Sequence, residues 1–167
     1  MKSLWLKHIR DIAILPFSVT CIIPALIYDP GDQAMPQHVL FRLSGAGLIV
    51  AGASVFVYTV FLFNRFGKGT LAPWSPKAKL IISGPYRYCR NPMISGVGLV
   101  LIGESFIFHS ATILIWTFAF FTINTLYFLF IEEPDLSRKF GEAYISYRKN
   151  VPRWLPRRTP FNGKLDA

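Results

Sequence analysis

Two arginines and two glutamates carry most of the ionic chemistry of this chain. Arg87 and Arg90 lie three residues apart just before an apolar run, and Glu132 and Glu133 follow the next apolar run. A guanidinium group can hold a carboxylate through two hydrogen bonds, and a carboxylate can accept hydrogen bonds from a pair of hydroxyls. If the two runs form a helical hairpin, all four charges meet at one membrane face. The alternative is that the cations only anchor the helices, which is the commoner role of a single flanking arginine.

The composition is that of an integral membrane protein. Of 167 residues, 52% are hydrophobic and only 16% are charged, which is too apolar for an ordinary soluble domain. The net charge of +9 comes from cations that flank apolar runs, so it is explained by topology and anionic lipid headgroups. We therefore expect no nucleic-acid binding. Cys21 and Cys89 should lie at different depths, which argues against a disulfide or a zinc site.

Four apolar runs predict an all-α membrane protein with about four transmembrane helices, at residues 12–28, 43–63, 93–108 and 111–131. The first contains Pro16 and Pro24 and is expected to be retained and kinked. The second has no charge and is long enough, at about 1.5 Å per residue, to cross about 30 Å of hydrocarbon. Only His109 and Ser110 separate the last two runs, which predicts a tight hairpin. The third run is short and contains Glu104, so whether it spans fully stays open.

The chain divides into four segments of a single functional domain: N-terminal helices (1–63), a basic loop (64–92), the hairpin (93–131) and a polar C-terminal segment (132–167). The basic loop has no acidic residue and should be cytoplasmic. Both termini are then cytoplasmic. The short spans favour a bacterial inner membrane, and the endoplasmic reticulum is left open as the alternative. Asn91 is the expected cap, and Pro92 the expected first residue, of the third helix.

The C-terminal segment predicts an amphipathic cytoplasmic helix over residues 134–149. Its apolar stripe, at helical spacing, consists of Leu136, Phe140, Tyr144 and Tyr147. Such a stripe can cover a pocket or lie on lipid, and the second role is the commoner one for a helix with a basic opposite face. The tail after Thr159 is expected to be dispensable.

These residues, in this order, resemble the isoprenylcysteine carboxyl methyltransferase family. The motifs are Gly-Pro-Tyr-Arg-Tyr from Gly84, Arg-Asn-Pro-Met from Arg90, the glutamate pair, Phe-Gly with two tyrosines, and Val-Pro-Arg from Val151. The wider group includes phospholipid amine methyltransferases. The resemblance covers roughly residues 64–158. It implies an integral membrane enzyme whose S-adenosylmethionine lies in a cytoplasm-facing pocket and whose lipophilic acceptor arrives from the bilayer.

The chemistry of that cofactor is compatible with the residues present. Its carboxylate suits an arginine, its ribose diol suits a glutamate, and its adenine and sulfonium suit aromatic rings. The resemblance implies catalytic roles for Arg90, Asn91 and Glu133. It implies cofactor contacts for a larger set: Tyr86, Arg87, Arg90, Asn91, Pro92, Glu132, Glu133, Tyr144, Tyr147 and Arg148. No metal is implied. Residues 69–73, ahead of Trp74, also resemble a pattern of bacterial members.

Methyl transfer by direct displacement requires positioning and water exclusion more than a strong base. A carboxylate acceptor arrives deprotonated, whereas an amine or thiol would need a base that the sequence does not offer. Asn91 stands where many relatives carry histidine, and Ile94 where a tyrosine often occurs, which weakens the case for a prenylated protein as acceptor. The acceptor is therefore left as a lipophilic protein, lipid or small molecule, and the oligomeric state is left open.

Other polar or small residues in the apolar runs are assigned structural roles. Glu104 is expected to be protonated or hydrogen-bonded across the hairpin near Trp116 and Thr117. His109 is expected to be a turn residue, because no second ligand lies at metal-site spacing. The glycines are read as helix-packing positions, because no strand precedes them. They are Gly96, Gly98 and Gly103.

Two alternatives to the enzyme stay open. A non-catalytic membrane scaffold or assembly protein would use Glu132 and Glu133 only to pair with Arg87 and Arg90. A small transporter subunit would depend on Glu104.

Overall fold

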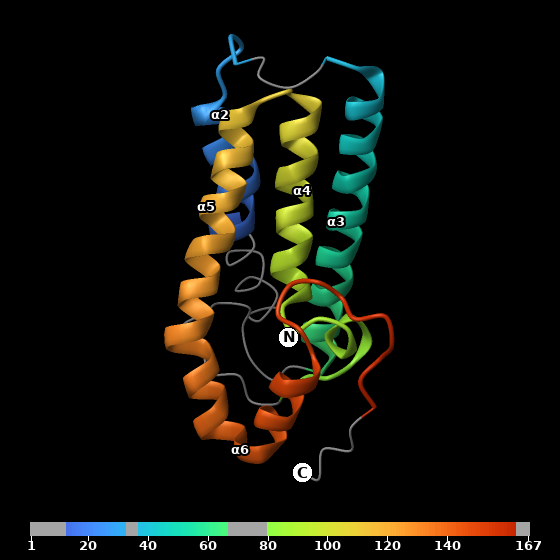
Figure 1. The fold of residues 1–167 in the computed structure, drawn as a ribbon, viewed down its shortest axis with the longest axis vertical. Coiled ribbons are helices and arrows are strands. Elements are labelled where there is room, and N and C mark those ends of the chain that lie inside the picture. Colours follow the sequence, from blue (N-terminus) through green and yellow to red (C-terminus); the bar gives the residue numbers. More distant parts are fainter. Residues whose placement is uncertain (1–12, 33–36, 67–79, 163–167) are drawn as a thin grey trace.

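The computed structural model describes residues 13–32, 37–66 and 80–162, and every regular element in these ranges is helical (Figure 1). The elements in chain order are η1 (Ala13–Ile22), α2 (Ile23–Ile27), α3 (Val39–Phe66), η2 (Gly84–Arg87), α4 (Pro92–Ile107), α5 (Ala111–Tyr127), η3 (Phe128–Glu132) and α6 (Glu133–Asn150). η1 and η3 are π-helical and η2 is a 3₁₀ turn. The predicted all-α class is confirmed for the part of the chain that is described.

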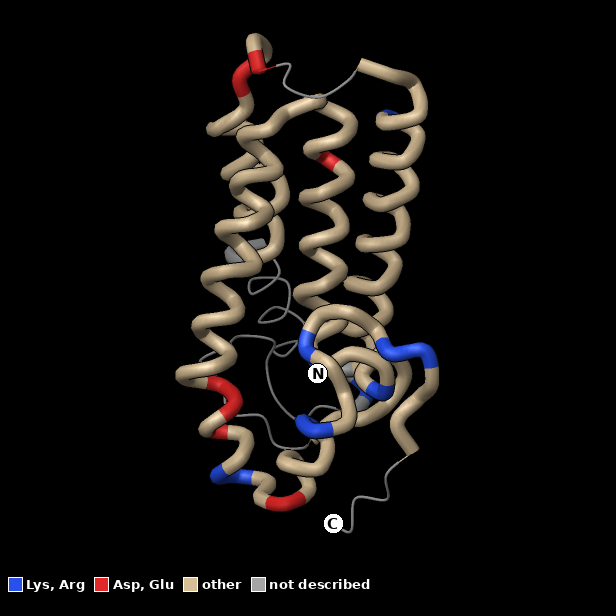
Figure 2. The backbone as a smooth tube through the Cα atoms, in the orientation of Figure 1, with Lys and Arg blue, Asp and Glu red and all other residues tan. Residues whose placement is uncertain are grey.

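Two helical stretches are long and apolar enough to cross a membrane, Val39–Leu62 and Ala111–Asn150. Pro16–Ile27 and Pro92–Ile107 are apolar but shorter. Charged residues lie mostly toward the two ends of the long helices, with one acidic position within α4 (Figure 2). A helical body of this kind, with an apolar band between charged ends, associates with membranes.

Helices α3 and α4 pack closely because glycines face each other across them. A Cβ at Gly96 would lie 2.8 Å from the Gly52 carbonyl oxygen, and one at Gly103 would lie 2.6 Å from the Gly45 carbonyl oxygen. Both distances are shorter than a side chain tolerates, so only glycine permits this approach of the two backbones. The helix-packing role predicted for Gly96 and Gly103 is confirmed.

The turn between α4 and α5 is as tight as predicted. His109 has a positive φ of 54°, and the Ser110 hydroxyl caps α5 by accepting a bond from the Ile113 amide at 3.3 Å. Asp32 accepts hydrogen bonds from the Ser110 hydroxyl at 2.9 Å and from the Thr112 amide at 2.9 Å. His109 is thus a turn residue, and the described residues hold no cluster of three or more groups suited to a metal ion.

The hydrogen bond expected for Glu104 across the hairpin is not formed with either candidate partner. The Trp116 indole donates to the Val19 carbonyl at 3.2 Å, and the Thr117 hydroxyl donates to the Ile113 carbonyl at 2.9 Å. One carboxyl oxygen of Glu104 is buried without a partner in the described ranges. The Trp116 donor is taken by a carbonyl of η1 and the Thr117 donor by a carbonyl one turn earlier in its own helix. The alternative expectation, a protonated Glu104, stays a prediction.

Helices α5, η3 and α6 follow one another without a loop, so the chain turns within helical residues. The single helix predicted over residues 134–149 is interrupted at Gly141, where φ is 54° and ψ is −135°. A left-handed backbone is open to glycine at little cost, which explains the position of the break. Tyr144 and Tyr147 are buried in a cluster with Leu136 and Phe140, so the predicted stripe packs on protein.

The two cysteines are unpaired, as expected. Cys21 is exposed on η1 and Cys89 is buried in the loop before α4.

Candidate active site

The loop before α4 is shaped by Gly84 at its start. Gly84 has a positive φ of 55°, and a Cβ there would lie 2.8 Å from Leu62 Cδ1. Pro92 is the first residue of α4, as predicted, and Asn91 occupies the N-cap position. The predicted cap position of Asn91 is confirmed, but its side chain makes no capping hydrogen bond. Its side chain lines a pocket instead.

Residues 151–162, which we name the C-terminal strap, hold this loop in place through backbone hydrogen bonds. The Arg90 amide donates to the Pro152 carbonyl at 2.9 Å, and the Arg157 amide donates to the Tyr88 carbonyl at 3.0 Å. Phe161 and Arg87 bond twice, through the Phe161 amide and the Arg87 Nε, each at 2.9 Å. These contacts of Phe161 argue against the expectation that the tail after Thr159 is dispensable.

Cys89 also connects the loop before α4 to the C-terminal strap. Its thiol lies 3.1 Å from the Arg153 carbonyl oxygen and 3.2 Å from that of Trp154, and it donates toward both. The Ser95 hydroxyl also donates to the Trp154 carbonyl at 3.1 Å. Burial raises the pKa of the Cys89 thiol, which keeps this donor protonated at neutral pH.

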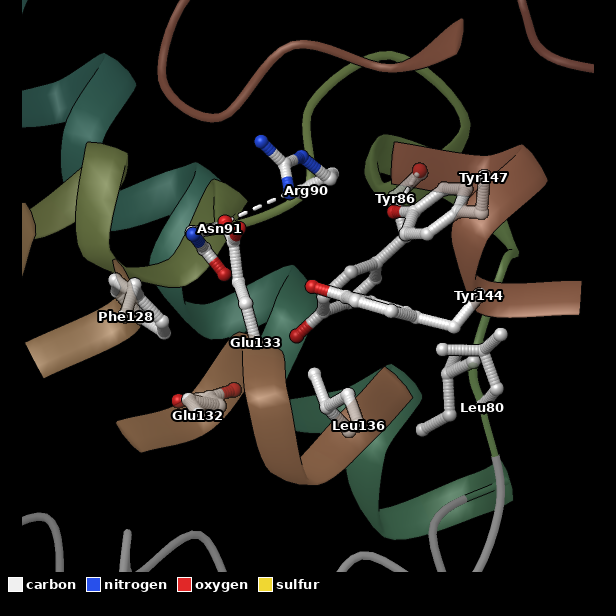
Figure 3. A pocket seen from close by; sticks show the side chains of 11 residues that line it. Leu80, Tyr86, Arg90, Asn91, Phe128, Glu132, Glu133, Leu136, Tyr144 and Tyr147 are labelled. Carbon is white, nitrogen blue, oxygen red and sulfur yellow. Dashed lines mark hydrogen bonds and ion pairs between the residues drawn. The ribbon is translucent and has the colours of Figure 1, made fainter. Parts of the chain in front are cut away.

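An ion cluster lies where the strap, the loop and α6 meet. Glu133 is only 3% exposed, and its Oε1 accepts hydrogen bonds from Arg90 Nη1 at 2.7 Å and Arg153 Nη2 at 2.8 Å. Arg153 Nε donates to the same oxygen at 3.0 Å, and Arg148 lies 3.6 Å from Oε2. Figure 3 shows the Glu133 side chain directed at Arg90. The sequence prediction that these opposite charges converge is confirmed for Arg90 and Glu133.

The balance of charge in the cluster favours an anionic group nearby. One carboxylate faces three guanidinium groups, of which Arg90 and Arg153 are 11% and 17% exposed. The Nε of Arg90 is buried and has no hydrogen-bond partner among the residues that the structure describes. A buried donor without an acceptor costs free energy unless a ligand or water satisfies it. The cluster can therefore accept a carboxylate or another small anion.

A small pocket adjoins the cluster, with a cavity volume of about 50 Å³. It is lined by Leu80, Ile81, Tyr86, Arg90, Asn91, Phe128, Glu132, Glu133, Leu136, Tyr144 and Tyr147 (Figure 3). Ionic groups form one side of it and aromatic and aliphatic groups form the rest. An elongated ligand with a charged end and a flat apolar end suits such walls.

The three tyrosines of the pocket form its aromatic side. Tyr147 donates its hydroxyl to the Tyr86 carbonyl at 2.6 Å, and the rings of Tyr144 and Tyr147 lie 6.3 Å apart. Burial, and then the charge of Glu132, raises the pKa of Tyr86 well above its usual value. The Tyr86 phenol is thus a neutral group that can donate a hydrogen bond at any physiological pH.

The structure brings together most, but not all, of the residues named from the sequence. Tyr86, Arg90, Asn91, Glu132, Glu133, Tyr144 and Tyr147 line the pocket. Arg87 instead bonds the strap, Pro92 is buried at the start of α4, and Arg148 contacts Glu133 from outside the pocket lining. Residues 69–74 lie outside the described ranges.

Comparison with known proteins agrees with this arrangement. The family model described as phospholipid methyltransferase matches residues 40–143, which is more than half of the chain. The chain belongs to the phospholipid methyltransferase family. No curated protein and no solved structure matches it. The resemblance drawn from the motifs is therefore confirmed at the level of this group of membrane methyltransferases.

The segment matched by the phospholipid methyltransferase model includes Arg90 and Glu133 but ends before the strap. Arg153, which the strap contributes, was missed as a site residue. Two signals in the sequence could have found it: the Val-Pro-Arg motif that follows α6, and an excess of arginine over glutamate at this end of the hairpin.

Proposed function

We propose that the chain is an S-adenosylmethionine-dependent methyltransferase that acts on a lipophilic acceptor, such as an isoprenylcysteine-like carboxylate or a lipid nucleophile. The observation that carries the proposal is the pocket beside Glu133, whose ion cluster leaves a buried Arg90 donor without an acceptor in the described part of the chain. This pocket is built largely within the segment that matches a family of membrane methyltransferases.

The residues present fit this cofactor. The Arg90 Nε and the excess positive charge of the cluster suit the cofactor carboxylate, and Glu132 offers oxygens to ribose hydroxyls. Tyr86 and Tyr144, with the aliphatic Leu136, offer walls for adenine and for the region of the sulfonium. S-adenosylmethionine, when bound, supplies an activated methyl group. Asn91 is assigned to the mouth of the site.

The protein's part in the transfer is to position groups and exclude water. Glu133 fixes the orientation of Arg90 through a 2.7 Å hydrogen bond, and the strap fixes Glu133 through Arg153. Groups held in this way lose little conformational freedom when the ligand binds. Displacement reactions gain much of their rate from such prior positioning. None of the described residues that line the pocket is a histidine, lysine or cysteine, and an acceptor that is already ionised suits these residues best.

The membrane arrangement that we propose has four spans, with η1 and α2 together as the first. The ion-cluster end, both termini and the C-terminal helix then lie on the cytoplasmic side, in a bacterial inner membrane. The absence of acidic residues from positions 64–91 supports this orientation. Membrane lipids and the acceptor are the expected partners.

A transfer assay tests the proposal. Nanodiscs that contain the protein and a total bacterial lipid extract are incubated with methyl-tritiated S-adenosylmethionine, and the organic phase is counted. We expect label in the lipid or hydrophobic fraction for the wild type and at least about a hundredfold less for Glu133→Gln, because Arg90 loses its orientation. No label with the wild type, when a second extract from eukaryotic membranes also gives none, contradicts methyl transfer to a lipophilic acceptor.

One observation favours a second candidate, the scaffold. Glu133 is fully engaged by arginines, as a purely structural ion cluster would be. Exchanging the charges, with Arg90→Glu and Glu133→Arg in one protein, should restore folding of a scaffold. The exchange should not restore cofactor binding to an enzyme.

A further inference from the structure

The C-terminal strap has two edges with different surroundings. On its inner edge, Arg153 bonds Glu133, and Trp154 packs against the rings of the hairpin. The residues of its outer edge are exposed, and Leu155 is 79% exposed. We call this set the outer edge of the strap, and its members are Leu155, Pro156 and Arg158.

The inner edge meets the hairpin within the apolar length of α5. The Trp154 indole donates to the Thr125 hydroxyl at 3.2 Å, and Thr125 lies in a stretch that is apolar and long enough to cross a membrane. Exposed apolar side chains continue past this point along the chain, at Leu126 and Phe130. Figure 1 shows the strap at the height of the first turns of α4. Leu155, the next residue after Trp154, therefore emerges beside a surface that suits lipid.

The charge around the outer edge is positive throughout. Residues 143–162 contain no aspartate or glutamate, and Figure 2 shows blue positions but no red ones along the strap. Arg153 is matched by Glu133, and Arg157 donates to the Asn150 carbonyl at the end of α6, at 2.8 Å. Arg158 lies exposed beside them. An anionic surface would complement this charge.

A single exposed leucine is common on protein surfaces and requires no partner. Leu155 differs because it directly follows a tryptophan that packs on the apolar hairpin, and because Arg158 follows it three residues later. Segments that lie at a membrane surface combine apolar side chains at the depth of the acyl chains with cations at the depth of the phosphates. The outer edge has both components.

We propose that the outer edge of the strap docks on anionic phospholipids, with Leu155 among the acyl chains and Arg158 at the headgroup phosphates. This surface lies outside the pocket, and the proposal does not depend on methyl transfer. Because Arg153 and Trp154 belong to the same strap, lipid bound at the outer edge also restrains the residues that contact Glu133 and α5. The order of the strap then depends on the charge of the surrounding lipid.

Hydrogen exchange of the strap tests the proposal. The full chain is placed in nanodiscs of phosphatidylcholine, with or without phosphatidylglycerol, and deuterium uptake over residues 151–162 is followed by mass spectrometry. The amides of Arg157 and Phe161 report on the strap, since they bond the carbonyls of Tyr88 and Arg87. We expect about fivefold slower exchange with phosphatidylglycerol, because a basic residue is attracted to an anionic surface. Equal exchange in the two lipids overturns the proposal.

Three variants show whether the effect belongs to the outer edge. Arg158→Gln removes its charge and Leu155→Ser its apolar contact, so each should abolish most of the slowing. Arg138→Gln is the matched control, because Arg138 is an 82% exposed cation on α6 that lies 3.8 Å from Asp135. It should keep the full effect of phosphatidylglycerol. Equal losses in Arg158→Gln and Arg138→Gln would overturn the proposal, because the response would then belong to the surface charge in general.

A last comparison separates a lipid headgroup from a free anion, since an arginine binds the phosphate of either. Inorganic phosphate is added to the phosphatidylcholine nanodiscs in place of phosphatidylglycerol. We expect no slowing of exchange, because Leu155 gains its apolar contact only from the bilayer. Slowing as large as that with phosphatidylglycerol would assign the site to a small anion and overturn docking on lipid. Either result leaves the proposed function untouched, because no outer-edge residue lines the pocket.

Discussion

Arg153 donates two hydrogen bonds to one oxygen of Glu133, from Nε at 3.0 Å and from Nη2 at 2.8 Å. The two residues are separated by the whole of α6, so the strap returns to the start of the helix that precedes it. Arg90 bonds the same oxygen from the loop before α4. One carboxylate thus joins three segments that are distant in sequence, and the geometry of the pocket depends on it.

Removing that carboxylate should destabilise the protein strongly. Glu133→Gln leaves Arg90 and Arg153 buried without a counter-charge, a change that typically costs about 3–5 kcal/mol of unfolding free energy. The measurement is thermal unfolding in detergent, followed by circular dichroism. Glu142→Gln is the matched control, since Glu142 is exposed on the same helix. Equal melting temperatures for the two variants would show that the ion cluster does not stabilise the fold.

The close approach of α3 and α4 predicts different effects for two glycine substitutions. Gly103→Ala sets a methyl group 2.6 Å from the Gly45 carbonyl oxygen and should cost about 1–3 kcal/mol of unfolding free energy. Gly47→Ala, on α3, meets no atom within 4 Å and should be neutral or stabilising, because alanine favours helix over glycine. Thermal unfolding in detergent, followed by circular dichroism, compares the two variants. A Gly103→Ala protein as stable as Gly47→Ala would contradict the helix contact.

Shortening the chain tests whether the strap secures the loop. Ending the chain after Thr159 removes Phe161, which exchanges two 2.9 Å hydrogen bonds with Arg87 and lies 5.9 Å, ring to ring, from Tyr147. We expect a lower melting temperature and faster proteolysis within residues 80–91. Ending the chain after Asn162 keeps these contacts and serves as the control. If both truncated proteins resist protease like the full chain, the contacts of Phe161 do not hold the loop.

The buried thiol predicts a dependence of stability on pH. Burial raises the pKa of the Cys89 thiol in the folded protein. The contribution of this thiol to stability is therefore fully present below the ordinary thiol pKa of about 8.5, which applies to the unfolded chain. That contribution is lost as the pH rises through the higher pKa of the folded protein, because the thiol ionises first in the unfolded state. Melting temperatures from pH 7 to 10.5 should fall more steeply for the wild type than for Cys89→Ser, which keeps a donor but does not titrate. Parallel curves would rule out this role of Cys89.

Much of the fold could be predicted because it follows from apolar run length and turn residues. The charge-free run within α3, the proline that begins α4 and the short His109 turn each determine a local feature without long-range information. The convergence of Arg90 and Glu133 could be predicted for the same reason, because two antiparallel helices bring their outer ends together.

Features could not be predicted in this way where the tertiary structure offers one side chain several possible partners. The Asn91 side chain was expected to cap α4, but it lines the pocket. Arg87 has the same residue type and spacing as Arg90, yet it bonds the backbone of Phe161. Whether an arginine reaches a carboxylate or a carbonyl is decided by the path of the strap, which the sequence does not reveal. The same path brings Arg153 to Glu133.

The most direct test is isothermal titration of the nanodisc-bound protein with S-adenosylmethionine and S-adenosylhomocysteine. We predict saturable binding of both to one site. Arg153→Lys should weaken it about tenfold, because an ammonium group cannot donate the two fixed hydrogen bonds that orient Glu133. Arg158→Lys, at an exposed strap position, should bind like the wild type. No binding to the folded wild type, or equal affinity in the two variants, would contradict a cofactor site organised by Glu133.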